Sequence, residues 1–410
     1  MAALYPFRAL RPRPSDAVHV AAVPYDVVTT EEARAQAADN PLSFLRVSRS
    51  ELELPPGTDP YSDAVYERAA QNFDRLKKQA LVLEDDPSVY LYRLRQGAHE
   101  QTGLAACFSI DEYDRDVIKK HERTRRDKED DRTRHMLALG AQTGPVWLVY
   151  RAAKRVDEIT VRVTSEIPLF AFKAADRVEH AVWRVTDGLR DALVGAFAAI
   201  PALYIADGHH RAASAARARD DIRHRGVTRC ALGDAADYTT LLAVAFPHDQ
   251  VRILPYNRIV KDLGTLTSDA FLTAVRDRFE TSAGLAEPSR RGETAMYVKG
   301  AWYTLRFRAL PGDADPIGSL DVSRLQEQLL APVLGIMDVR TDTRIDFVGG
   351  VRGTRELERL VDSGKAAVAF SMYPVGVDDL MAVSDVGALM PPKSTWFEPK
   401  LRDGLLIHLI

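Results

Sequence analysis

Short apolar runs alternate with amphipathic segments through the first 250 residues of the chain, which predicts strands mixed with helices. Residues 59–79 carry apolar side chains at helical spacing on one face, and this predicts an amphipathic helix. Residues 88–94 and 102–110 predict a β-hairpin. Further strands are expected at 144–151, 180–185, 201–206 and 239–247, and further helices at 187–199, with Asp187 as N-cap, and at 212–220.

The pattern changes near Leu254, where a second set of elements begins. This set comprises a hairpin over 295–308, helices over 322–334 and 354–363, strands over 345–348 and 366–373, a short helix and a closing strand over 404–410. We therefore expect a mixed α/β (α+β) protein with two domains, residues 1–254 and residues 255–410.

Composition and charge exclude several classes of protein. A formal net charge of −3 over 410 residues gives no basic field for nucleic acid or an anionic membrane. No uncharged apolar run approaches ~20 residues, and we expect no signal peptide, because the first residues are rich in arginine and proline and have no long apolar core. Cys107 and Cys230 form neither a CxxC pair nor a disulfide framework, which suits the reducing cytoplasm. We expect a cytoplasmic protein without nucleic-acid or membrane partners.

The stretch "YIADGHHRAASAARA" at 204–218 combines a buried strand, a glycine turn and a helix. Free N–H groups and the helix dipole make such a turn a site for phosphate, which Gly208 allows to approach and which His209, His210 and Arg211 can bind. Alternatively, Asp207 caps the helix and the histidines are solvated. A zinc site is a third possibility, although adjacent histidines in one turn rarely converge on one ion.

The charged run at 114–135 has two interpretations. It is either a solvated helix with ion pairs along its length or part of a site. In the second case Glu122, held among lysines and arginines, stays ionised and can accept a proton or bind Mg²⁺.

The segment "MPPKSTWFEPKLRDGLLIHLI" at 390–410 contains side chains that could bind a ligand and aromatic side chains that could fix them in place. Lys393, Ser394 and Thr395 present a cation and two hydroxyls, and Trp396 and Phe397 can anchor them. The alternative is a docked segment with a solvated lysine.

Five motifs resemble the domain-of-unknown-function family DUF1015, and the resemblance spans nearly the whole chain. They are "PYDVV" at 24–28, "NPLSFLRVSR" at 40–49, "KKHERT…DKEDDR" at 119–132, "DGHHR" at 207–211 and "PPKSTWFEPKL" at 391–401. A more distant resemblance links "KHE" at 120–122, "DGHHR" and "PPKST" at 391–395, in this order, to the free serine kinases of the ParB/sulfiredoxin superfamily.

The second resemblance implies a ParB/sulfiredoxin-like nucleotide-binding core with an additional C-terminal α+β domain whose tail returns to the active site. It implies a kinase that transfers a phosphoryl group from ATP or ADP to free L-serine, with Mg²⁺ as cofactor. Glu122 would be the general base, and Asp207 would hold the metal or assist the base. Residues 208–211 would bind the nucleotide phosphates, and residues 393–395 the substrate.

Two points stay open. A ParB-like regulatory protein could use the same phosphate turn without phosphoryl transfer, although the charge balance and the lack of a helix-turn-helix argue against it. Asp26, Ser43 and Arg46 either line the cleft or fix the N-terminal fold.

Overall fold

A computed structural model describes residues 2–226, 237–309 and 315–410, and Cys230 lies outside these ranges. The chain divides into two compact units. Unit 1 comprises Met1–Val251 together with Pro399–Ile410, and unit 2 is Arg252–Glu398. The first boundary lies close to the expected one, whereas the last residues of the chain belong to unit 1 instead of the second domain. The described helices include none that is long and apolar enough to cross a membrane.

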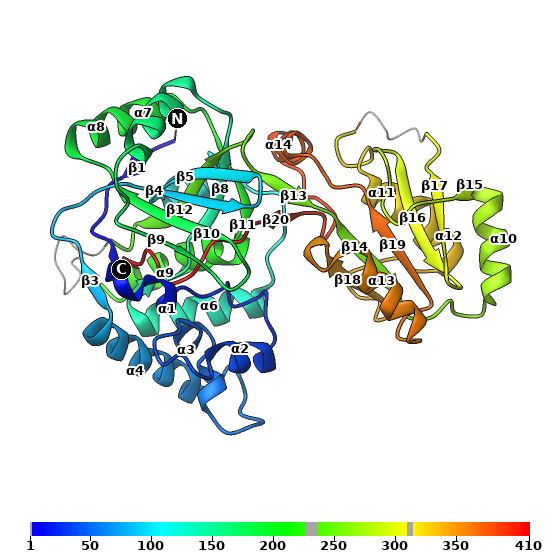
Figure 1. Cartoon of the computed structure of the whole chain (residues 1–410), viewed down its shortest axis with the longest axis horizontal. Coiled ribbons are helices and arrows are strands. Elements are labelled where there is room, and N and C mark those ends of the chain that lie inside the picture. The colour runs from blue at the N-terminus through cyan, green and yellow to red at the C-terminus, as the bar shows by residue number, and fades with distance from the viewer. Residues whose placement is uncertain (1, 227–236, 310–314) are drawn as a thin grey trace. The chain divides into compact units, whose positions relative to one another are not determined.

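Unit 1 is built on a nine-stranded mixed sheet, in the order β6-β11-β8-β12-β5-β4-β10-β9, with β1 paired to β5 (Figure 1). The expected mixed α/β class is confirmed, since β11 runs parallel to β6 and β12 parallel to β8 while the other pairs are antiparallel. The strands are β1 (Leu4–Tyr5), β4 (Tyr90–Gln96), β5 (His99–Ser109), β6 (Ile118–Lys119), β8 (Val146–Tyr150), β9 (Phe170–Lys173), β10 (Glu179–Arg184), β11 (Leu203–Asp207) and β12 (Thr240–Pro247).

Helices surround this sheet and bury two separate clusters of apolar side chains. One cluster joins the sheet to α7 (Lys154–Thr164), α8 (Asp187–Phe197) and α9 (His209–His224). The other joins α2 (Thr30–Ala37), α3 (Leu45–Ser48) and α4 (Asp63–Gln79). The remaining α-helices of unit 1 are α1 (Ala17–Val20), α5 (Ile110–Asp114) and α6 (Arg126–Leu139).

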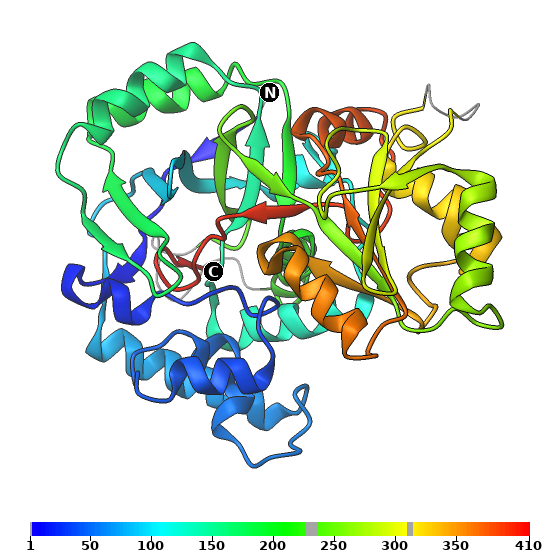
Figure 2. The same ribbon diagram turned by 45° about the vertical axis from the view of Figure 1, so that its right-hand side comes forward.

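The C-terminal segment of the chain is part of the core of unit 1. Residues 401–409 are all buried, and Ile407 exchanges backbone hydrogen bonds with Leu10 of β2 (Leu10–Pro12). The expected closing strand is short, because only β21 (His408–Leu409) pairs with β7 (Ala141–Gln142). Figures 1 and 2 show this red segment lying among the blue and green elements of unit 1. The C-terminal segment therefore pairs with the N-terminal part of unit 1.

Unit 2 contains a six-stranded antiparallel sheet in the order β15-β17-β16-β19-β14-β18. These strands are β14 (Tyr256–Val260), β15 (Glu280–Ala283), β16 (Glu293–Val298), β17 (Ala301–Arg306), β18 (Ile345–Gly349) and β19 (Val368–Met372). The α-helices are α10 (Ser268–Arg278), α11 (Asp321–Leu325), α12 (Ala331–Leu334), α13 (Gly353–Asp362) and α14 (Val377–Asp385). Two short ladders complete the fold: β13 (Arg252–Leu254) pairs with β20 (Trp396–Glu398) in unit 2, and β2 with β3 (Leu81–Leu83) in unit 1.

Several element boundaries differ from those that the sequence pattern predicts. Helix α9 begins at His209 and not at 212, because Gly208 adopts a left-handed φ of +94° and turns the chain directly into the helix. Thr186, and not Asp187, is the N-cap residue of α8. The expected helix over 322–334 is interrupted by a π-helical turn between α11 and α12. The charged run at 114–135 is not one solvated helix: it contains β6 and part of α6, and Asp131 and His135 are buried.

Candidate functional site

Strand β11 ends at Asp207, and Gly208 connects it directly to α9. The first turn of α9 therefore lies at the C-terminal end of this strand. The left-handed φ of Gly208 is a conformation that residues with a Cβ rarely adopt, so the turn favours glycine at this position. The first N–H groups of a helix have no partner within it, so this turn offers backbone donors to an anion.

Asp207 forms an ion pair with a lysine from the C-terminal segment. The Nζ atom of Lys400 lies 2.7 Å from Oδ2 of Asp207, and the lysine side chain is mostly buried. Burial on its own raises the pKa of Asp207, but the charges of Lys400 and Arg211 outweigh burial and hold the pKa below its ordinary value. Asp207 is thus a stable carboxylate at neutral pH.

His209 connects the turn to the loop that carries Glu122. Its Nε2 atom accepts a hydrogen bond from the backbone N–H of His121 at 3.4 Å, and its Nδ1 lies 3.8 Å from Oε2 of Glu122. Burial is the main cause that lowers the pKa of His209 well below its ordinary value. Because Nε2 accepts, the neutral ring carries its proton on Nδ1, the nitrogen nearer the carboxylate. The Glu122 side chain itself is 41% exposed, so it remains accessible.

His210 makes a second connection to the same loop. Its Nε2 atom accepts a hydrogen bond from the backbone N–H of Arg125 at 3.0 Å. Burial lowers the pKa of the neighbouring His121 to about 4, and its ring packs edge-on against that of His209 with centroids 4.4 Å apart. The sequence predicts that both histidines donate hydrogen bonds to phosphate. In the structure each ring instead accepts a hydrogen bond, from the backbone N–H of His121 or of Arg125.

The guanidinium of Arg211 is buried beneath the turn. It donates a hydrogen bond to the carbonyl of Pro145 at 2.7 Å and lies 3.9 Å from Oδ1 of Asp26. Burial lowers the pKa of Arg211, but Asp403, Asp26 and Asp207 together raise it above its ordinary value. Burial raises the pKa of Asp403 to about 6, even though Arg211 acts against this shift. The Arg211 side chain thus joins the turn to the N-terminal and C-terminal segments of unit 1.

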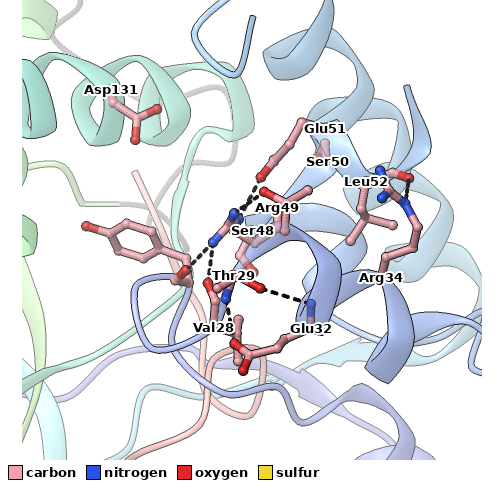
Figure 3. A network of polar contacts seen from close by, with 12 residues as sticks. Val28, Thr29, Glu32, Arg34, Ser48, Arg49, Ser50, Glu51, Leu52 and Asp131 are labelled. Carbon is pink, nitrogen blue, oxygen red and sulfur yellow. Dashed lines mark hydrogen bonds and ion pairs between the residues drawn. The ribbon is translucent and has the colours of Figure 1, made fainter. Parts of the chain in front are cut away.

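The loop that carries Asp26 is held in place by Arg49, the last residue of the "NPLSFLRVSR" motif. Its guanidinium donates to the carbonyls of Tyr25 and Val28 at 2.8 and 2.7 Å, and it pairs with Glu51 at 2.6 Å. Figure 3 shows this network beside the start of α2, where Thr29 and Glu32 form a capping box. Arg46 donates to the carbonyls of Ala37 and Asn40, at and just after the end of α2, and pairs with Glu53. These motifs therefore fix the N-terminal fold and place Asp26 beside Arg211.

We expect Arg49→Met to lower the free energy of unfolding by about 2–3 kcal/mol, because it leaves two partly buried carbonyls without their donor. Urea denaturation of the full chain measures this change. Arg34→Met is the matched control, since the exposed Arg34 makes a 3.4 Å bond to the carbonyl of Leu52, and its loss should be below about 1 kcal/mol. Equal stabilities of the two variants would show that Arg49 does not hold the loop.

The described residues contain no group of three or more His, Cys, Asp or Glu side chains that could hold a metal ion. Among the described residues, the protein therefore does not supply the set of three or four side-chain ligands that a zinc site needs. The same residues are compatible with Mg²⁺, which usually binds one or two carboxylates together with the phosphates of a substrate. Asp207 supplies one such carboxylate at the end of β11.

The structure brings Glu122, Asp207 and residues 208–211 together in unit 1. Lys393, Ser394 and Thr395 belong to unit 2, before β20. The Nζ atom of Lys393 lies 5.7 Å from the centroid of the Tyr256 ring, and Ser394 Oγ donates to the carbonyl of Pro391. Their role in binding the substrate therefore stays a prediction.

Sequence reasoning missed Lys400, although it lies in the same motif as Lys393. The spacing of the two lysines does not show which one contacts Asp207. Lys400 and Asp207 are 193 positions apart in the sequence. Sequence reasoning also missed the roles of Asp403 and of the two histidines as acceptors. These roles depend on pairings between distant segments.

Comparison with protein families adds to this geometry. The model of a family described as "Protein of unknown function (DUF1015)" matches residues 4–323. The chain belongs to the DUF1015 family. No curated protein matches this DUF1015 member.

Several solved structures are similar to this DUF1015 protein at low identity. A free serine kinase in complex with AMP is 15% identical, with 73% of this chain and 92% of that chain covered and a TM-score of 0.36. A conserved hypothetical protein from Pyrococcus furiosus is 14% identical, with coverages of 74% and 95% and a TM-score of 0.36. SbnI with a C-terminal truncation, from Staphylococcus aureus, is 11% identical, with coverages of 74% and 87% and a TM-score of 0.38. These values do not bear on the activity.

Proposed function

We propose that this protein is a nucleotide-dependent kinase that phosphorylates the hydroxyl group of a free amino acid, L-serine, with ATP or ADP as donor. The observation that carries the proposal is the placement of Glu122 beside the first turn of α9, where its Oε2 lies 3.8 Å from Nδ1 of His209. An accessible carboxylate thus lies next to a helix N-terminus suited to phosphate. The order of the three kinase-like motifs along the sequence also supports the proposal.

In the proposed reaction, Glu122 is the general base. The hydroxyl oxygen of the substrate attacks the terminal phosphorus of the nucleotide, and the bond from that phosphorus to the leaving nucleotide oxygen breaks. The hydroxyl proton passes to the carboxylate of Glu122. The nucleotide phosphates bind to the turn formed by residues 208–211, chiefly through its backbone N–H groups, since both histidine rings and the Arg211 guanidinium contact other parts of unit 1.

We propose that Asp207 would hold Mg²⁺ when a nucleotide is bound. Bound Mg²⁺ would neutralise charge on the nucleotide phosphates. Lys400 contacts Oδ2 of the same carboxylate, and its ammonium group would also suit a nucleotide phosphate.

Product analysis tests the proposal directly. The full chain is incubated with Mg²⁺, L-serine and either ATP or ADP, and O-phospho-L-serine is measured by mass spectrometry. A panel of other hydroxyl-bearing amino acids in the same assay identifies the preferred substrate. Product that depends on protein and nucleotide is the expected result. Nucleotide binding by calorimetry without any phosphorylated product would instead support the ParB-like regulatory protein.

Residues 393–395 are proposed to bind the substrate, with Lys393 paired to the carboxylate of serine. We expect Lys393→Ala to raise the KM for serine about 10–100-fold, with a much smaller change in the KM for nucleotide, because one charge-assisted contact to the substrate is lost. Steady-state kinetics with each substrate varied in turn measures both constants. Lys365→Ala, which removes an exposed lysine elsewhere in unit 2, is the control. An unchanged KM for serine in Lys393→Ala would remove Lys393 from the site.

A further inference from the structure

The two histidines of the "DGHHR" turn hold the loop that precedes α6. His209 Nε2 accepts from the backbone N–H of His121, and His210 Nε2 accepts from that of Arg125. Adjacent residues on the first turn of α9 thus bind the two ends of one short loop. Glu122 lies inside this loop.

The contact between the two segments continues along α9. Ser214 Oγ donates to the carbonyl of Glu129 at 3.2 Å, and Arg217 pairs with the side chains of Glu129 and Asp130. Thr124 Oγ1 donates to the same Glu129 side chain from within the loop. The loop and the start of α6 are therefore fastened to one face of α9, and the histidines form the end of this contact nearest Asp207.

The chemistry of the rings explains why histidine suits both positions. A backbone N–H needs an acceptor, and a neutral imidazole supplies one nitrogen that accepts and one that donates. At His209 the remaining Nδ1–H lies toward Oε2 of Glu122, 3.8 Å away, so the same ring contacts the loop backbone and faces its carboxylate. If both rings faced solvent, neither backbone N–H group of the loop would have a ring nitrogen as its acceptor.

We propose that His209 and His210 are positioning residues, which hold the His121–Arg125 loop so that the carboxylate of Glu122 lies at the phosphate turn. The catalytic part of this inference rests on the proposed role of Glu122 as the base. The structural part, that the rings hold the loop, is independent of any activity. The two parts are therefore measured separately.

The first experiment compares His210→Leu with His210→Gln. Glutamine can place an acceptor oxygen near the position of Nε2, whereas leucine has a similar size and no acceptor. Hydrogen–deuterium exchange of the full chain without nucleotide reports on the peptide that contains the Arg125 amide. We expect leucine to speed this exchange about tenfold, which corresponds to the loss of one hydrogen bond, and glutamine to restore most of the protection. His224→Leu, at the exposed far end of α9, should change nothing in this peptide.

The second experiment measures kinetics on the same variants. We expect His210→Leu to lower kcat about tenfold or more with little change in the KM for nucleotide, and His210→Gln to recover much of kcat. His209→Gln and His209→Leu repeat the comparison at the buried position, and urea denaturation confirms that each variant is folded. Unchanged exchange in His210→Leu, or equal loss in the leucine and glutamine variants, would overturn the proposal. Altered exchange in a protein that makes no phosphorylated product with any variant would uphold the holding of the loop and reject the kinase function.

Discussion

Replacement of Glu122 by glutamine should lower kcat by about 10²–10⁴-fold, which makes it the most damaging single change in the proposed site. Glutamine keeps the size and polarity of glutamate but cannot accept the proton of the substrate hydroxyl. The KM for nucleotide should change little, because the phosphates are proposed to bind the first turn of α9 and not this carboxylate. Measurement of both constants by product formation therefore separates a lost base from a lost binding contact.

Glu158→Gln is the matched control for this change. Glu158 lies on α7, is 49% exposed and pairs with Arg155, so it resembles Glu122 in exposure without lying near the phosphate turn. Its replacement should leave kcat unaltered. If Glu122→Gln turned over at the rate of the parent protein, Glu122 would belong to the solvated charges of its segment and the proposed mechanism would be wrong.

Lys400→Met should lower the free energy of unfolding by about 2–4 kcal/mol, the largest stability effect that we expect from one substitution in the site. The lysine side chain is largely buried and lies 2.7 Å from Asp207, so its loss leaves a mostly buried carboxylate. Of the two charges that lower the pKa of Asp207 most, only that of the nearby Arg211 guanidinium then remains to offset part of the cost of burial. Urea denaturation of the parent and the variant measures the difference. Equal midpoints and slopes would show that the ion pair contributes nothing to stability.

The same ion pair can be tested by a double-mutant cycle and by pH. Asp207→Asn combined with Lys400→Met should recover much of the loss, since it leaves no buried charge unpaired. The lowered pKa of Asp207 gives the sign of the pH effect: the stabilisation is present above the unfolded-state pKa of about 4 and is lost as the pH falls further. The difference between parent and Lys400→Met should therefore be constant near pH 7 and shrink in acid. A difference that grows in acid would contradict this assignment.

The local parts of the site could be predicted from the sequence. A buried strand followed by Asp-Gly and a run of small residues indicates a strand, a turn and a helix, and the structure contains all three at β11, Gly208 and α9. The pattern places the start of this helix at residue 212, whereas α9 begins at His209 because the left-handed φ of Gly208 lets the helix begin at once. Hairpin β4–β5 and the helix α4 also follow from local patterns.

The pairings between distant segments could not be predicted. Whether a histidine donates or accepts depends on the group that faces it, and His209 and His210 face backbone N–H groups 88 and 85 positions earlier in the chain. Local pattern also favoured a solvated helix for the charged run, whereas tertiary packing buries Asp131 against the hydroxyl of Tyr66, which donates to it. Periodicity describes one segment at a time, so it carries no information about such contacts.

The return of the C-terminal segment to unit 1 has a consequence for the order in which the protein can be made. Unit 2 is an insertion in unit 1, so a ribosome synthesises Arg252–Glu398 completely before it adds the residues that finish the first unit. A nascent chain that has not reached residue 400 lacks the cation that pairs with Asp207, and the backbone partner of Leu10 is still missing. The candidate site can only be completed after residue 400 has left the ribosome tunnel, which is later than all of unit 2. Incomplete translation products would therefore lack the assembled site even when most of the sequence is present.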